Sequence, residues 1–210
     1  MDKGMRGLYA IIDPQSCPSD PIAIAERVLM GGCAALQLRD KLASDSEFLV
    51  LGRQLSARCR CAGVPFIVND RYRLAAELEA AGVHVGQTDA TVHAIRRALG
   101  PGYLIGVSTH SLRQAQQAER DGANMIGFGP VFATRTKLPP EPSVGLEALA
   151  AVCEQLSIPV VAIGGVTLDN ARAIATSGAS MGAAISALCA AADPEATARA
   201  LHAQLCVPQC

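Results

Sequence analysis

The feature that most limits the possible folds is a regular alternation of short apolar runs with longer, alanine-rich amphipathic segments along all 210 residues. The apolar runs begin about 25 residues apart on average, which is the length of one strand followed by one helix. They lack strict polar–apolar alternation, as expected of parallel strands that are buried on both faces. The predicted strands are residues 8–13, 34–39, 65–70, 82–87, 104–109, 125–130, 159–165 and 181–186.

The segments between these runs have helical patterns. Asp20, Ser111 and Asp193 precede three of them as N-terminal capping residues, and two of these caps are followed by proline. Glycines end several others, at positions 63, 82, 122 and 178. The predicted helices are residues 20–30, 46–62, 73–81, 90–99, 111–121, 145–156, 170–176 and 193–205.

Eight strands in strict alternation with about eight helices predict an α/β fold, a single (β/α)₈ TIM barrel that spans residues 1–210. A doubly wound sheet is the structural alternative, but it usually has fewer strands. Half of the residues are hydrophobic while only 3% are aromatic, so the core must consist mainly of Ala, Val, Ile and Leu. That composition is typical of parallel strands covered by helices.

Charge and hydropathy narrow the classes of partner. The net charge is −1 without a block of like charges, so the sequence favours neither nucleic acid nor an anionic membrane surface as a partner. No apolar run approaches the roughly 18 residues that span a bilayer, and the first residues lack the apolar core of a signal peptide. We therefore expect a cytoplasmic protein whose eight cysteines are reduced thiols.

The functional residues of such a barrel lie at the carboxyl ends of the strands and in the loops that follow. At the end of the run 34–39, alternation places Gln37, Arg39 and Lys41 on one side. A face made only of donors suits a phosphorylated ligand. The alternative is a cluster of ion pairs that cap the next helix.

Two carboxylates follow neighbouring predicted strands. Asp70 ends the run 65–70, and Asp89 comes after the run 82–87. Adjacent parallel strands are about 4.8 Å apart, so both carboxylates can reach one ion, and Mg²⁺ beside a phosphate is the ion they fit best. For Asp89 the alternative is N-capping of the helix at 90–99.

Other candidates lie on the later strands. Ser108 is a donor to a phosphate or a polar ring atom, or else a cap of the next helix. The loop 129–137 combines hydroxyls and cations beside a glycine, as in an anion clamp. The segments after 159–165 and 181–186 are the usual phosphate site of this fold, although a glycine pair also suits a tight turn. We interpret His84 as a hydrogen-bonded barrel residue and not as a catalytic base.

This distribution predicts two anion sites at one mouth. The site near strands 34–39, 65–70 and 82–87 suits a diphosphate with Mg²⁺, and the glycine-rich site suits a monophosphate. Two phosphorylated small molecules held face to face indicate a coupling reaction in which diphosphate leaves.

At these residues the chain resembles the thiamine phosphate synthase family, over about residues 7–205. Six motifs stand in the family's order, and together they are highly specific. They are QLRDK (37–41), NDR (69–71), GVHVGQTD (82–89), IGVSTH (105–110), GPVFATRTK (129–137) and VAIGGV (161–166).

The resemblance implies a role for each matching residue. The pyrimidine diphosphate would be bound by Gln37, Leu38, Arg39, Asp40, Lys41, Asn69, Ser108 and Lys137. Four of these, Arg39, Lys41, Ser108 and Lys137, would be catalytic. The thiazole phosphate would be bound by Thr134, Arg135, Thr136, Gly165, Ile185 and Ser186. The cofactor Mg²⁺ would be held by Asp70 and Asp89.

The implied reaction joins 4-amino-2-methyl-5-(diphosphooxymethyl)pyrimidine to 4-methyl-5-(2-phosphoethyl)thiazole, or to its carboxylated form, and releases diphosphate. The implied mechanism is dissociative and needs no acid or base. A thiazole tautomerase of the same barrel and a regulatory, non-catalytic relative are the alternatives. A sugar-phosphate isomerase would need an acid/base pair that the sequence lacks. The oligomeric state stays open between a monomer and a homo-oligomer.

Overall fold

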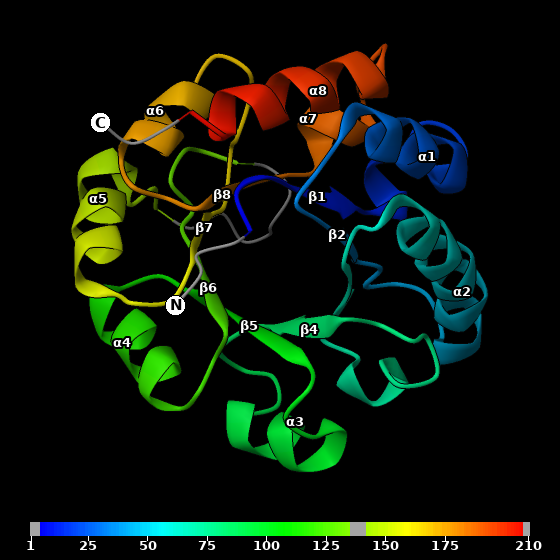
Figure 1. Ribbon diagram of the computed structural model, residues 1–210, viewed down its shortest axis with the longest axis horizontal. Helices are drawn as coiled ribbons and strands as arrows, with labels where there is room; N and C mark the ends of the chain where they lie inside the picture. The colour runs from blue at the N-terminus through cyan, green and yellow to red at the C-terminus, as the bar shows by residue number, and fades with distance from the viewer. Residues whose placement is uncertain (1–4, 135–141, 208–210) are drawn as a thin grey trace.

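The computed structural model describes residues 5–134 and 142–207, and it contains one closed barrel of eight parallel strands in the order β1 to β8 (Figure 1). Each predicted strand is present, although most end one to three residues earlier than predicted. The fold prediction of a single (β/α)₈ barrel is therefore confirmed. The strands are β1 Gly7–Ile12, β2 Ala35–Leu38, β3 Phe66–Asn69, β4 Gly82–Val85, β5 Leu104–Thr109, β6 Met125–Phe128, β7 Val160–Ala162 and β8 Met181–Ala184.

Helices surround the strands on the outside of the barrel (Figure 1). Asp20, Ser111 and Asp193 each accept a hydrogen bond from a first-turn amide, so all three predicted caps are present. The helices are α1 Pro21–Gly31, α2 Asp45–Ala62, α3 Val92–Leu99, α4 Leu112–Arg120, α5 Gly145–Gln155, α6 Ala171–Thr176, α7 Ser186–Cys189 and α8 Pro194–Leu205. Two short 3₁₀ helices are η1 Pro14–Ser16 and η2 Tyr72–Leu74.

The predicted helix at 73–81 is wrong. The short connection between β3 and β4 contains η2 followed by turns, not an α-helix. Asp70 and Glu79 both have left-handed backbone angles, with φ of 56° and 49°, and such angles interrupt a right-handed helix on either side. Gly82 is the first residue of β4 and does not end a helix.

Two apolar layers stabilise the barrel. Tyr9, Ile67 and Met125 belong to an inner cluster that fills the barrel itself. A larger outer cluster lies between the strands and the helices. Because β8 has small residues at positions 182–184, α8 packs close to it: a Cβ atom added at Gly182 would lie 2.8 Å from the side chain of Leu205.

The close packing of α8 extends to α1, and it makes Gly31 hard to replace. A Cβ atom at Gly31 would overlap the carbonyl oxygen of Glu195 and lie 2.8 Å from the Cβ atom of Ala198. We expect Gly31→Ala to lower the free energy of unfolding by about 1–3 kcal/mol, since one of the two helices must shift. Gly102→Ala is the control, because a Cβ atom there meets nothing within 4 Å. Urea unfolding of both variants is the test, and an equal effect would contradict the packing argument.

Two further features bear on the sequence predictions. Within the described residues, none of the helices is long and apolar enough to cross a membrane. The seven cysteines in this part of the chain are all free thiols. Burial raises the pKa of Cys33 and Cys59 to about 12, so these two thiols are protonated at neutral pH.

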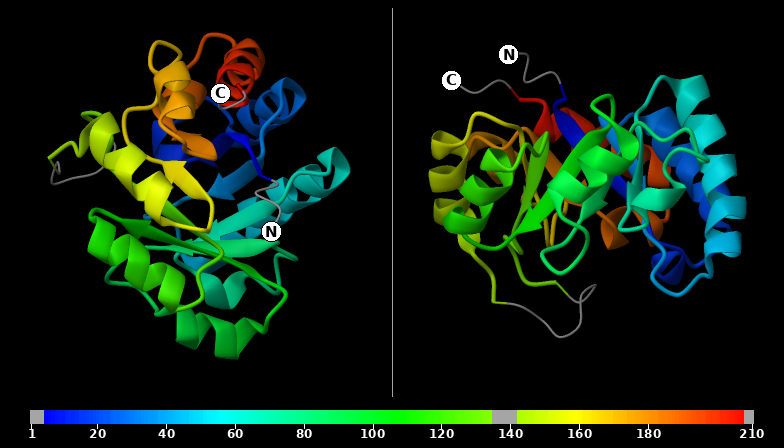
Figure 2. Two further views of the ribbon diagram at one scale, coloured as in Figure 1. Left: turned by 60° about the vertical axis from the view of Figure 1, so that its left-hand side comes forward. Right: turned by 90° about the horizontal axis from the view of Figure 1, so that it is seen from below.

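The two ends of the barrel differ. The amide of Leu8 donates a 3.2 Å hydrogen bond to His202 Nδ1, so the start of β1 adjoins α8 near its end. Both lie at the top of the right-hand view in Figure 2. The carboxyl ends of the strands point to the opposite side, where the functional residues of such a barrel are found.

Candidate active site

Strand β2 directs Gln37 into the barrel. The Gln37 side chain is almost completely buried, and its Nε2 donates a 2.9 Å hydrogen bond to the hydroxyl of Tyr9. Burial raises the pKa of Tyr9, so this hydroxyl stays protonated. Leu38 alternates to the outer side and packs in the core beneath the helices. Only the backbone of Leu38 is therefore placed to meet a ligand in the barrel.

The two cations that follow β2 are both paired. Arg39 forms an ion pair with Asp13, which is buried at the end of β1, and Lys41 forms one with Asp70. The interpretation of this face as purely donor is therefore wrong, because neighbouring strands contribute carboxylates to it. Of the alternative, an ion-pair cluster that caps the next helix, the ion pairs are present but the capping is not, since Ser44 caps α2 in a capping box.

Asp40 has a local role. Its Oδ1 accepts hydrogen bonds of 3.1 Å from the amides of Leu42 and Ala43. Such side-chain bonds to the backbone shape a turn. Asp40 therefore fixes the loop that carries Lys41.

The predicted pair of carboxylates does converge. Asp70 follows β3 and Asp89 follows the adjacent β4. Asp70 Oδ2 accepts a 2.8 Å hydrogen bond from Asn69 Nδ2. Burial raises the pKa of Asp70, Asp89 raises it further through its charge and hydrogen bonding, and Lys41 acts in the opposite direction. The two carboxylates thus lie close together at the mouth, with Lys41 paired to one of them.

Asp89 is held by a loop and does not cap a helix. Its Oδ2 accepts a 2.7 Å hydrogen bond from the amide of Gly86. The cap of α3 is Thr91, whose side chain accepts from the amide of Ala94. The helix-capping alternative for Asp89 is therefore excluded.

The donor set fits Mg²⁺ better than a tightly ligated metal. Within residues 5–134 and 142–207, no group of three or more His, Cys, Asp or Glu side chains could hold a metal ion. Mg²⁺ needs only one or two carboxylates, because waters and substrate phosphates complete its shell. Asp70 and Asp89, two neighbouring carboxylates at the mouth, match that requirement.

Ser108 faces the barrel interior and does not cap α4, whose cap is Ser111. Its Oγ lies 3.0 Å from Nε2 of His84, with which it shares a hydrogen bond. Burial lowers the pKa of His84 to about 4, so the imidazole is neutral at physiological pH. The prediction that His84 is a hydrogen-bonded barrel residue is confirmed.

The glycine pair after β7 lies at the same mouth. Gly164 and Gly165 have φ of 89° and 68°, and a Cβ atom at Gly165 would lie 2.7 Å from the carbonyl oxygen of Ala133. The tight-turn interpretation of this pair is therefore correct. It brings the loop after β7 against the loop after β6.

The remaining predicted residues for the thiazole phosphate belong to two loops. Ile185 and Ser186 stand where β8 passes into α7, and Ser186 is exposed. Thr134 is half-buried after β6. Arg135, Thr136 and Lys137 lie outside the described residues.

Comparison with known proteins supports the resemblance over nearly the whole barrel. A profile of the family described as thiamine monophosphate synthase matches residues 8–188. The chain belongs to this family. It is 42% identical to the thiamine-phosphate synthase of Roseiflexus castenholzii over 198 residues, which cover 93% of this chain and 87% of that protein.

Two other family comparisons extend this result. A bifunctional thiamine biosynthesis protein of Geobacter sulfurreducens is 42% identical over 193 residues, which cover 92% of this chain and 39% of that protein. The solved structure of a thiamine phosphate pyrophosphorylase from Pyrococcus furiosus has a TM-score of 0.88 and 32% identity, covering 97% of this chain and 96% of that one. The chain is thus an enzyme of the transferase class, with a family role in thiamine biosynthesis.

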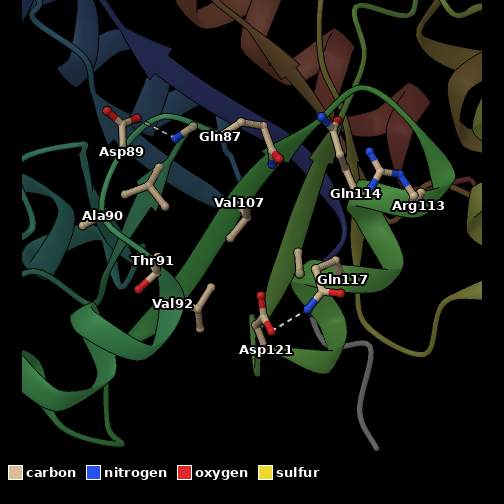
Figure 3. A pocket seen from close by; sticks show the side chains of 13 residues that line it. Gln87, Asp89, Ala90, Thr91, Val92, Val107, Arg113, Gln114, Gln117 and Asp121 are labelled. Atoms are coloured by element: carbon tan, nitrogen blue, oxygen red, sulfur yellow. Dashed lines mark hydrogen bonds between the residues drawn. The ribbon is translucent and has the colours of Figure 1, made fainter.

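A hollow of about 290 Å³ lies outside the barrel of this family member, between α3 and α4 and over β4 and β5 (Figure 3). Gln87 and Gln114 line one end of it, and Asp121 hydrogen-bonds to Gln117 at the other. Asp89 is at the rim of the hollow and turns back to the amide of Gly86 (Figure 3). Gly86, Gln87 and Asp89 of one family motif line the hollow, so it adjoins the barrel mouth on its outer side.

Sequence reasoning missed one residue beside the candidate site. Asp13 ends the first apolar run, 8–13, just as Asp70 ends the run 65–70. This position at the end of a strand is the sequence signal that could have identified Asp13 as a residue near the barrel mouth. Nothing in the sequence indicates its ion pair with Arg39, which depends on the pairing of β1 with β2.

Proposed function

We propose that the chain couples the pyrimidine diphosphate to the thiazole phosphate named above and releases thiamine phosphate and diphosphate. The observation that carries the proposal is the convergence of Asp70, Asp89 and Lys41 at the barrel mouth. Two neighbouring carboxylates, one of them paired with a lysine whose side chain is half-exposed, form a site for a diphosphate and its cation. Family membership supports the choice of substrates.

In this proposal Asp70 and Asp89 would hold Mg²⁺, which supplies neutralisation of charge on the leaving diphosphate when it is bound. Arg39 is oriented by its ion pair with Asp13, and it directs its remaining donors to the mouth. Lys41 and the family lysine Lys137 add point charges. These groups strengthen their contacts as negative charge develops on the departing oxygen.

The pyrimidine would lie deeper in the barrel, against Gln37. Because Gln37 Nε2 donates to Tyr9, the orientation of the amide leaves Oε1 to accept from an amino group of the ring. Asn69, fixed by its hydrogen bond to Asp70, lines the same wall. These contacts hold the reacting methylene carbon below the diphosphate.

The reaction we propose is dissociative. The bond between the methylene carbon and the diphosphate oxygen breaks first, and the thiazole nitrogen then donates its electron pair to that carbon. No side chain has to transfer a proton in this sequence. The neutral, buried state of His84 is consistent with that absence of acid–base chemistry.

The thiazole phosphate would bind across the mouth, at the loops after β6, β7 and β8. The tight turn at Gly165 brings two of these loops together. Backbone amides in such loops bind phosphate in many barrels. By family resemblance, the contributing residues are Thr134, Arg135, Thr136, Gly165, Ile185 and Ser186.

The decisive test is to incubate the purified protein with both substrates and Mg²⁺, and to follow thiamine phosphate and diphosphate by chromatography. We expect both products in equal amounts, and neither when one substrate is omitted or the metal is chelated. Isomerisation of the thiazole without coupling would instead establish a tautomerase. Binding without any turnover would establish a regulatory protein.

A further inference from the structure

The centre of the barrel contains a notch that fits one imidazole ring. His84 pairs in register with Gly106 on β5, and Ser108 pairs with Gly127 on β6. A Cβ atom at Gly106 would overlap His84 Nδ1, and one at Gly127 would lie 3.3 Å from its Cε1. Two neighbouring strands therefore leave out their side chains where the ring lies.

The packing around this notch fixes the ring. The Tyr9 ring meets it edge-on, with 6.2 Å between centroids and an interplanar angle of 63°. Only 7% of His84 is exposed, so the ring has little room to turn. Its Nε2 is held 3.0 Å from Ser108 Oγ.

We propose that His84 is a positioning residue that orients the Ser108 hydroxyl as a hydrogen-bond donor to the leaving diphosphate. The proposal rests on the proposed function and on the family resemblance, which places Ser108 among the residues that bind the pyrimidine diphosphate. His84 acts through Ser108 in this view and exchanges no proton with the substrate. Its role is distinct from that of a catalytic base.

The pattern of hydrogen bonds determines which nitrogen carries the proton. In the part of the chain that the structure describes, His84 Nδ1 is buried without a hydrogen-bond partner. A buried N–H group without an acceptor is rarely tolerated, whereas an unpaired acceptor is tolerated more often. The proton therefore resides on Nε2, which donates to Ser108 Oγ.

This arrangement determines what Ser108 presents to the mouth. An oxygen that accepts from His84 keeps its own hydrogen for another partner, and an anion is the partner that benefits most. The backbone of Ser108 is fixed as well, because Gln87 Nε2 donates a 2.7 Å hydrogen bond to its carbonyl oxygen. The hydroxyl is thus prepared in one orientation before the ligand arrives, which avoids reorganisation during the reaction.

A matched pair of substitutions tests the proposal. His84→Gln places an amide N–H near the position of Nε2, whereas His84→Asn places it near Nδ1. We expect kcat of His84→Gln to remain within about threefold of the wild type, and kcat of His84→Asn to fall by about tenfold, as for one weakened transition-state contact. Equal losses in the two variants would overturn the proposal. Thermal unfolding must show that both variants are folded.

The Ser108→Ala background separates an indirect role from a direct one. If His84 acts through Ser108, His84→Asn should cause no further loss of kcat in that background. A second tenfold loss there would show that His84 contacts the substrate itself, and it would overturn the proposal.

A spectroscopic measurement keeps the proposal testable if a variant fails to fold. The ¹⁵N chemical shifts of His84 in the wild-type protein should report a neutral ring protonated at Nε2, and protonation at Nδ1 would overturn the proposal. This result does not depend on turnover. A failure of the proposed function would appear separately, as wild-type protein that forms no thiamine phosphate.

Discussion

Asp70→Asn should reduce kcat by about 10²–10³-fold, the typical cost of removing one preorganised electrostatic group from an active site. The variant removes one of the two carboxylates that face each other at the mouth, and it leaves Lys41 without its partner. Asparagine is preferable to alanine because it tolerates the left-handed backbone at this position, where φ is 56°. The fold should therefore be preserved.

The measurement is kcat as a function of Mg²⁺ concentration, with circular dichroism to verify folding. Asp89→Asn should show a similar loss, since Asp89 adjoins Asp70. Asp121→Asn is the matched control, because Asp121 accepts from Gln117 on α4, away from the mouth. An unchanged Mg²⁺ dependence in Asp70→Asn would show that the carboxylate pair does not hold the metal.

Arg39→Met should affect stability and activity together. The Asp13 side chain is only 3% exposed, and the substitution leaves its carboxylate buried without its cation. Breaking one partner of a buried ion pair typically costs about 3–5 kcal/mol, so the free energy of unfolding should fall by that order. Activity should fall as well, because the guanidinium is a proposed contact of the diphosphate.

The double variant Asp13→Asn with Arg39→Met separates the two effects. Removing both charges abolishes the uncompensated carboxylate, so most of the lost stability should return. The activity should not return, since no guanidinium is restored. Urea unfolding and steady-state kinetics of the wild type and both variants are the measurements, and recovery of activity in the double variant would contradict a role for Arg39 in binding.

Most of the fold could be predicted because each strand of a parallel barrel is buried on both faces and is therefore continuous in its hydrophobicity. The structure of the connection at 70–81 could not be predicted, because the spacing of its apolar residues resembles that of a helix. Left-handed angles at Asp70 and Glu79 flank the turns that replace that helix; aspartate adopts such angles more often than most residues, but the glutamate at position 79 gives no indication of them. Local backbone geometry of this kind is set by the return of the chain to the barrel.

The sequence predicts which residues lie at the candidate site better than it predicts the ion pairs and hydrogen bonds that these residues form. Asp70 and Asp89 could be placed together because the carboxyl ends of adjacent parallel strands share one edge. The partners of Arg39 and His84 could not be named, because they come from other strands and depend on register. A polar residue at the end of a strand is therefore expected at the barrel mouth, whereas its ion-pair and hydrogen-bond partners are known only from the structure.

The contact between the start of β1 and α8 has a consequence for how this barrel can be joined to other proteins. Both lie on the face opposite the mouth, with Leu8 hydrogen-bonded to His202. A partner domain linked through either segment would lie on the face opposite the mouth and leave substrate entry open. The same closeness means that a short linker could join the two segments, so that the chain could be opened at another loop without altering the order of strands around the ring.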